Sequence, residues 1–323
     1  MVKVNKKFFM VFAALICVFS MTGVSAAQQV FINIATGGTG GTYYPLGGAF
    51  ADIWTHQVTG ARLNVTVQTT GGSVANTNLL RHNHVEVSIN QNDIAYYAKH
   101  GVVLFDTPFP EIRGAASLFS EVFQLVTDAA SNINSVADLR GRRVAIGAIG
   151  SGTEACARQM LRAAGLDADV DIEARHLSFV EAVTAIRDRQ IEAAIVLAGI
   201  PTGAVTDLAT TNNVRITPIC YDIATKLLDE YSFYVRFTIP AGTYRGQDED
   251  VETVAVRAII TVREEFDADL LYEMLETLFD NQERIIRSHS AGRFINLETA
   301  LDGMSIPLHS GAERFFRNRG LID

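Results

Sequence analysis

Hydrophobic positions along residues 31–219 alternate between two periods. Short runs, apolar throughout or at every second position, are followed by longer stretches whose apolar residues recur at helical spacing. The runs predict strands at 31–34, 63–69, 85–89, 112–119, 123–127, 142–147, 172–177, 193–197 and 214–219. Predicted helices begin near residues 42, 73, 93, 151, 178 and 201. Strands that alternate with helices in this way are typical of parallel, doubly wound α/β sheets.

A strand followed by a glycine-rich loop and a helix occurs twice, and this predicts two lobes. The first loop spans 37–42 and the second spans 147–153. From about Val251 the chain changes to a β-branched run and then to amphipathic segments, which we expect to cover the first lobe. The predicted organisation is lobe 1 at 27–120 and 255–323 and lobe 2 at 121–254, joined by a hinge that the chain crosses near 120–128 and 235–260.

The first glycine loop predicts an anion site. Gly37, Gly38, Gly40 and Gly41 allow the backbone to turn and to approach a ligand, and the helix that follows points free N–H groups at it. The loop lacks the Gly-Lys-Ser/Thr of a P-loop and the third glycine of a dinucleotide fingerprint. No basic residue lies between positions 31 and 54 to balance a polyphosphate. The loop therefore favours a small carboxylate over a nucleotide.

The N-terminal residues predict export. Residues 1–26 combine a basic start, an apolar core at 8–19 and the ending Val24-Ser25-Ala26, which is the pattern of a secretory signal peptide. The formal net charge is −9 and becomes more negative without this leader, which argues against nucleic acid or an anionic membrane as partner. Cys156 and Cys220 remain, and they are either a disulfide of an oxidising compartment or small buried hydrophobic residues.

The polar candidates also have structural interpretations. Thr42, Ser73 and Ser151 could be helix caps, and Ser151–Glu154 and Ser178–Glu181 have the spacing of capping boxes. Ser151 lies between two glycines, but the G-x-S-x-G pattern of a hydrolase is absent, so a Ser151-dependent hydrolase is the least favoured interpretation. The spacing of zinc or calcium ligands is also absent, and we expect neither a metal nor a cofactor.

Several longer blocks resemble a known family. They are NIATGGTGGTYYPLGGAFADIW, TTGGSVANTNLL, QNDIAYYA, VAIGAIGSGTEACARQML, AGTYRGQDEDVETVAV and IPLHSGAERFFRNRG. In this order they are similar to the TAXI family, the extracytoplasmic solute receptors of one branch of TRAP transporters. The resemblance implies a type II periplasmic-binding-protein fold, a periplasmic monomer, hinge closure on a small acid such as glutamate, another dicarboxylate or a keto acid, and a membrane permease, fused into one subunit, that an ion gradient drives. A binding protein of an ABC importer or a sensor system is the alternative with the same fold.

The same resemblance implies a set of ligand-binding residues. They are Thr39, Gly40, Gly41, Thr42, Tyr43, Ser73, Asn76, Gln91, Asp93, Ser151, Gly152, Thr153 and Glu154. One departure from the family pattern is Ala75, where an acidic residue is expected before Asn76. If that acid contacts a ligand amine in the family, the alanine argues against an amino acid as ligand here.

Overall fold

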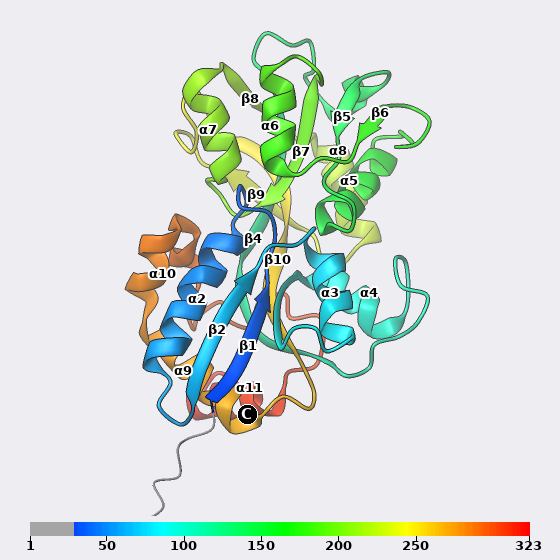
Figure 1. The fold of residues 1–323 in the computed structure, drawn as a ribbon. Coiled ribbons are helices and arrows are strands. Elements are labelled where there is room, and N and C mark those ends of the chain that lie inside the picture. Colours follow the sequence, from blue (N-terminus) through cyan, green and yellow to red (C-terminus); the bar gives the residue numbers. More distant parts are fainter. Residues whose placement is uncertain (1–28) are drawn as a thin grey trace, which may run out of the picture.

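The computed structural model describes residues 29–323, so the predicted leader at 1–26 lies outside the described residues. Within the described part, no helix is long and apolar enough to cross a membrane. The chain is divided into two parts that share two long strands, β4 (Ile112–Asp128) and β10 (Val251–Arg263), as Figure 1 shows.

Lobe 1 denotes the part that contains both chain ends of the described region, together with the halves of β4 and β10 that pair with it. Its other elements are β1 (Gln29–Ala35), α2 (Tyr43–Gln57), β2 (Arg62–Gln68), α3 (Ser73–Arg81), β3 (Val87–Gln91), α4 (Asn92–His100), α9 (Ala268–Asp280), α10 (Gln282–Ser288), the 3₁₀ helix η3 (Ser290–Phe294) and α11 (Ser310–Asn318).

Lobe 2 denotes the other part, with the remaining halves of β4 and β10. Its elements are the 3₁₀ helix η2 (Val136–Leu139), β5 (Arg143–Ala145), α5 (Gly152–Ala163), β6 (Glu173–Arg175), α6 (Phe179–Arg187), β7 (Ala193–Ala198), α7 (Gly203–Thr211), β8 (Val214–Thr217), α8 (Tyr221–Glu230) and β9 (Val235–Ile239).

The strands form one continuous ladder in the order β2-β1-β3-β10-β4-β7-β5-β6, with β8 on β4 and β9 on β10. The outer strands pair in parallel, β1 with β2 and β3, and β5 with β6 and β7. The central strands are antiparallel to their neighbours, β10 to β3 and β4, and β4 to β7 and β8. The α/β class is confirmed, but the expected parallel sheet is interrupted at its centre, because β4 and β10, the strands that join the lobes, run antiparallel to their neighbours.

Strand β4 corrects the prediction of two strands at 112–119 and 123–127. The polar pair Ser120 and Glu121 interrupts the apolar pattern, yet the backbone continues to pair through it, with Glu121 opposite Val256 of β10. Shifts in register follow in β10 at Arg257/Ile259 and Ile260/Thr261. The two strands that connect the lobes are therefore continuous, and β10 is irregular where it enters lobe 1.

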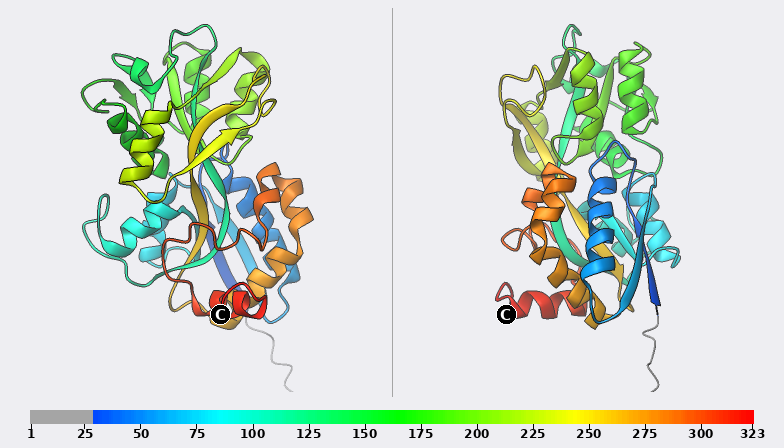
Figure 2. Two further views of the ribbon diagram at one scale, coloured as in Figure 1. Left: turned by 180° about the vertical axis from the view of Figure 1, so that it is seen from behind. Right: turned by 60° about the vertical axis from the view of Figure 1, so that its left-hand side comes forward.

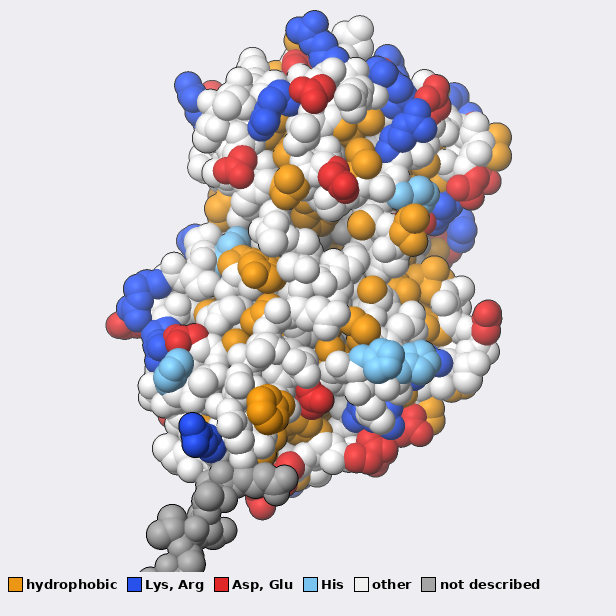
Figure 3. Space-filling view, viewed as in Figure 1, with side chains coloured by type: hydrophobic (Ala, Val, Ile, Leu, Met, Phe, Trp, Pro, Cys, Tyr) orange, Lys and Arg blue, Asp and Glu red, His pale blue; other side chains and the backbone are white. Residues whose placement is uncertain are grey.

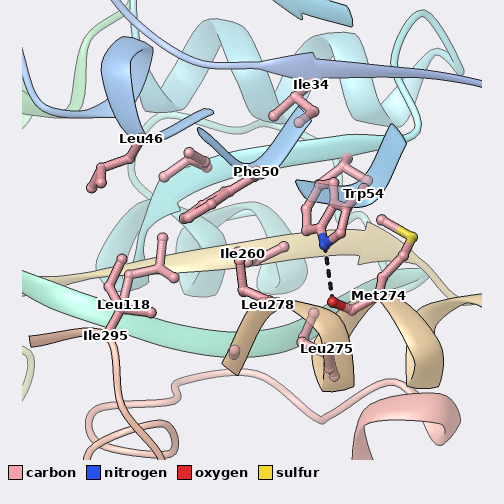
Figure 4. Close-up of a cluster of buried hydrophobic side chains, with 14 of the residues drawn as sticks. Ile34, Leu46, Phe50, Trp54, Leu118, Ile260, Met274, Leu275, Leu278 and Ile295 are labelled. Atoms are coloured by element: carbon pink, nitrogen blue, oxygen red, sulfur yellow. Dashed lines mark hydrogen bonds between the residues drawn. The ribbon is translucent and has the colours of Figure 1, made fainter. Parts of the chain in front are cut away.

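The C-terminal segment covers lobe 1, as the amphipathic pattern predicts. Helices α9 and α10 lie beside α2 in both views of Figure 2, and α11 packs against α9 at the far end of lobe 1. Trp54 of α2 is buried among residues of this segment, and its Nε1 donates a hydrogen bond to the carbonyl oxygen of Met274 at 2.9 Å (Figure 4). The lobe 1 core thus combines residues 32–119 with residues 258–316.

Lobe 2 has its own cores on the two faces of its sheet, built from residues 122–256. A smaller cluster joins the lobes: Ile94, Tyr97 and Ala98 of α4 pack with Ala155 of α5, and Phe233 lies against them. That the ranges 27–120 with 255–323 and 121–254 move as separate units remains a prediction.

Local predictions failed mainly at helix starts. Asp93 does not cap α4 but lies in its first turn, after Gln91 at the N-cap. Ser73 is the first residue of α3, and Gly72 precedes it with a φ of 116° that favours glycine. The Ser178–Glu181 capping box is confirmed, whereas Ser151 caps α5 without a reciprocal bond from Glu154. Helices α8 and α10 and strand β9 were not predicted.

Candidate functional site

A cavity of about 360 Å³ lies between the lobes. Its walls come from the first loop, the β2–α3 turn, the second loop, the start of α6 and the end of β7. The lining residues are Gly37, Gly38, Thr39, Gly40, Gly41, Thr42, Tyr43, Thr69, Thr70, Gly71, Gly72, Ser73, Gln91, Glu121, Ala148, Ser151, Gly152, Thr153, Ser178, Phe179, Val180, Leu197 and Ala198. Most residues that the sequence proposed for the site are thus brought together around one cavity.

The first glycine loop contacts lobe 2 directly. The carbonyl oxygen of Gly40 accepts a hydrogen bond from the Ala204 N–H of α7 at 3.0 Å. A Cβ atom on Gly40 would lie 2.7 Å from the Val180 side chain. The Thr42 hydroxyl donates to the carbonyl oxygen of Gly199 at 3.2 Å. Glycine is therefore required at position 40 for the two lobes to approach this closely.

The second loop meets the β2–α3 turn in the same way. The Ala75 N–H donates to the carbonyl oxygen of Gly150 at 3.1 Å, which joins α3 to the second loop. A Cβ atom on Gly152 would lie 1.2 Å from Gln91 Oε1. Any larger residue at position 152 would consequently displace Gln91 or separate the lobes.

The hydroxyl groups on the cavity wall are held by backbone amides. Ser151 Oγ accepts a hydrogen bond from the Glu154 N–H at 3.0 Å and so caps α5. Ser73 Oγ accepts one from the Gln91 N–H at 3.0 Å and lies 3.4 Å from the Tyr43 hydroxyl. These side chains are positioned before any ligand binds.

Helix N-termini supply the positive potential of the cavity. Lining residues include the first residues of α2, α3, α5 and α6, from both lobes, and the N-cap of α4. Free N–H groups and the helix dipole favour an anion at each of these ends. None of the residues around this cavity is Lys, Arg or His. In Figure 3 the charged side chains gather on the outer parts of both lobes, and the band between them is mostly uncharged.

Comparison with known proteins assigns the chain to a family and a fold. Residues 34–320 match the NMT1-like family. The chain belongs to the NMT1-like family. The match covers nearly all of the described residues, including both glycine loops.

Three solved structures of similar fold are named as binding proteins or as a ligand-binding component. The alkanesulfonate-binding protein SsuA from Xanthomonas axonopodis pv. citri, bound to MOPS, is 14% identical at a TM-score of 0.53, over 90% of this chain and 85% of that one. The periplasmic binding protein BugD is 10% identical at 0.58, over 90% and 94%. A ligand-binding component of an ABC-type import system from Staphylococcus aureus, with zinc bound, is 9% identical at 0.51, over 91% and 93%. These likenesses show that this NMT1-like chain has the periplasmic-binding-protein fold.

Glu121 is a lining residue that sequence reasoning did not include in the site. Its side chain is 3% exposed, and its carboxylate accepts a hydrogen bond from the Tyr43 hydroxyl. Burial raises the pKa of Glu121 to about 8 and also raises the pKa of Tyr43. The signal in the sequence was the acidic side chain of Glu121 within the mostly apolar segment 112–127. A strand that is buried on both faces is normally apolar along its length.

Three of the proposed site residues of this NMT1-like chain are not on the cavity wall, namely Asn76, Asp93 and Glu154. Asn76 is buried and donates to the carbonyl oxygens of Thr36 and Ile89, so it joins α3 to the sheet. Asp93 is buried against Cys156 behind Gln91. Glu154 points away and pairs with Arg158 of the same helix at 3.3 Å.

Other lining residues carried no sequence signal. Phe179, Val180 and Leu197 are apolar residues of ordinary strand and helix segments, and only the tertiary fold brings them to the cavity. The two cysteines do not pair: Cys156 is buried and Cys220 is exposed. Among the described residues no group of His, Cys, Asp and Glu could hold a metal ion.

Proposed function

We propose that this protein is an extracytoplasmic solute-binding receptor that captures a small carboxylate between its two lobes. The observation that carries the proposal is the convergence of the N-termini of α2, α3, α5 and α6 on one cavity without a basic side chain. Each helix end favours an anion by about 0.3–1 kcal/mol. A carboxylate is held there by backbone N–H groups from both lobes.

Ligand entry requires the lobes to separate. The backbone hydrogen bonds from Ala204 to Gly40 and from Ala75 to Gly150 join the lobes across the cavity. These bonds break when the lobes part, while β4 and β10 remain as the connection. A ligand that contacts both loops interacts with more groups in the closed form and shifts the population toward it.

The cavity supports a small ligand. Its volume of about 360 Å³ is at the lower end of ligand pockets, which span roughly 300–1,000 Å³. We propose a glutamate-like molecule, another dicarboxylate or a keto acid. When ionised, the Glu121 carboxylate accepts a hydrogen bond from a ligand ammonium group. When protonated, it donates a hydrogen bond to a carboxylate or keto oxygen.

For delivery we propose a TAXI-type TRAP permease, which an ion gradient drives. The blocks quoted above support this partner. Delivery to an ABC importer is the second candidate, because one of the similar structures is a component of such a system. Uptake in membrane vesicles separates the two: abolition by a collapsed ion gradient supports the first, and an absolute requirement for ATP supports the second.

The test of the receptor function is a thermal-shift panel of L-glutamate, other dicarboxylates, amino acids and keto acids, followed by calorimetry. At a ligand concentration one hundred times Kd, binding stabilises the folded state by about 2.7 kcal/mol. The variant Gly152→Ala should lose binding, since its Cβ meets Gln91. Gly48→Ala is the matched control, because no atom lies near the added methyl group.

The receptor hypothesis is contradicted if no small acid shifts the unfolding temperature, or if Gly152→Ala binds as tightly as Gly48→Ala. Hydrolysis of an ester or amide that Ser151→Ala abolishes would instead favour an enzyme. The Ser151 hydroxyl caps α5 and contacts no base among the residues described.

A further inference from the structure

A buried carboxyl group lies at the contact between the lobes, beside the cavity but not on its wall. Asp93 of α4 is 0% exposed, and its Oδ2 accepts a hydrogen bond from the Cys156 thiol of α5 at 3.6 Å. Its Oδ1 has no hydrogen-bond partner within the described residues. Cys156 is also 0% exposed. An acid of lobe 1 is therefore covered by lobe 2.

Polar side chains from both lobes complete this contact. Tyr234, which precedes β9, donates to Gln159 Oε1 of α5 at 2.6 Å. Gln159 in turn donates from Nε2 to the Tyr97 hydroxyl of α4 at 3.1 Å. The chain of hydrogen bonds crosses from lobe 2 to lobe 1 one helical turn from Asp93. It forms only when α4 and α5 are packed together.

Within residues 29–323, no cationic side chain acts on Asp93. The titratable groups that act on it or respond to it are Cys156 of α5, Tyr97 of α4, Tyr234 before β9, Glu121 of β4 and Tyr43 of α2. All of these are neutral or acidic. A buried carboxylate without a cation or a full set of donors is unfavourable, and protonation removes that cost.

We propose that Asp93 couples closure of the two lobes to the uptake of one proton. When the lobes close, a proton from solvent binds the Asp93 carboxyl group, and when they separate, water solvates the group and the proton leaves. The loaded receptor thus carries a proton together with its ligand. This proposal rests on the proposed opening and closing of the lobes.

The direction of the pH effect follows from burial. In the closed structure burial raises the pKa of Asp93 to about 6, from the ordinary value of 3.8. The closed state therefore binds the proton more tightly, and closure becomes more favourable as the pH falls from about 6 to about 4. One proton gives at most about a tenfold change in the closed-to-open ratio per pH unit. Glu121 adds a second dependence that extends to about pH 8.

The two cysteines among the described residues, Cys156 and Cys220, provide the measurement without a ligand. Cys220 is exposed and reports the intrinsic reactivity of a thiol at each pH, whereas the buried thiol of Cys156 lies against Asp93 of lobe 1, and we expect it to react when the lobes separate. The probe is 4,4′-dithiodipyridine, which reacts with thiols at acid pH. The ratio of the Cys156 rate to the Cys220 rate follows the open population between pH 4 and pH 8.

The variant Asp93→Asn keeps the shape of the side chain and cannot ionise. Between pH 6 and pH 4 the ratio should fall more steeply in the native chain than in D93N, by about tenfold per pH unit. Asp229→Asn, on the exposed face of α8, is the control and should behave as the native chain. Asp93→Ser serves as the second variant if D93N does not fold by circular dichroism.

Equal slopes in the native chain and in D93N would overturn the proton coupling and leave the receptor function standing. If Cys156 stays unreactive at every pH in the folded chain, the contact between its thiol and Asp93 does not open to solvent, and the proton coupling is wrong, whereas the receptor function is not affected.

Discussion

The two glycine loops have the same sequence of strand, loop and helix, but they use their hydroxyl groups differently. In the second loop Ser151 caps its own helix, α5. In the first loop Thr42 makes no cap for α2, and its hydroxyl reaches across to the Gly199 carbonyl of lobe 2. Both loops contact the other lobe through their backbones, but the hydroxyl group of the second loop bonds within its own lobe, whereas that of the first bonds between the lobes. The same local pattern of strand, glycine loop and helix therefore contributes to folding stability in the second loop and to closure of the lobes in the first.

The largest expected difference between the two loops is the loss of folding stability when a glycine is replaced by alanine. Gly147 has a φ of 104°, and a Cβ there would lie within 2.9 Å of atoms of its own loop, so Gly147→Ala should destabilise folding by about 1–3 kcal/mol. Gly40→Ala meets only Val180 and Ala204 of the other lobe, and its free energy of unfolding should change by less than about 0.5 kcal/mol. Urea denaturation of both variants measures this. Equal losses of stability would remove the distinction between the loops.

Removing the hydroxyl groups of Ser151 and Thr42 should change stability less than the glycine substitutions, and again more in the second loop than in the first. Ser151→Ala removes a helix cap and should cost about 1 kcal/mol of stability. Thr42→Val keeps the shape of the side chain and loses the bond to Gly199, so its unfolding temperature should hardly change. Instead, Cys156 should be labelled faster in Thr42→Val than in Ser151→Ala, because the closed form is weakened. The reverse order of labelling rates would contradict this division of roles.

Glu121, between the loops, should make folding stability depend gradually on pH. Its pKa is raised to about 8 in the structure, so the folded state binds a proton that the unfolded state releases above about pH 4.5. Stability must therefore fall as the pH rises from 4.5 to 8, by at most about 1.4 kcal/mol per pH unit. Glu121→Gln should flatten this decline in thermal unfolding measured across that range. A decline that is unchanged in the variant would show that another group is responsible.

The sequence was sufficient for the parts of the fold that depend on local pattern. The βαβ periodicity gave β1 to β3 and β5 to β7 with their helices, and the glycine loops marked the cavity. Because Glu121 interrupts the apolar pattern, the sequence predicts two strands where the structure has the single strand β4. The structure explains this acidic residue by the cavity that it lines. The antiparallel course of β10 between β3 and β4 depends on pairings far apart in the chain, which no local period encodes.

The candidate site was predictable where backbone chemistry defines it. Ser151 and Gly152 lie in the second glycine loop, which the repeated strand–loop–helix pattern places at the cleft, and Ser73 was implied by the family resemblance. The family resemblance placed Asp93 and Asn76 on the wall, yet both are buried behind it. Which way such a side chain points depends on the packing of α3 and α4 against neighbouring elements. The apolar wall residue Phe179 had no distinguishing pattern at all.

The central claim is that the two loops close together on a small carboxylate, and small-angle X-ray scattering tests it most directly. The native chain and Gly152→Ala are measured with and without the acid that gives the largest thermal shift for the native chain. The account predicts that the radius of gyration falls when the native chain binds the acid and does not fall in Gly152→Ala. A native chain that binds the acid with an unchanged radius of gyration would contradict it.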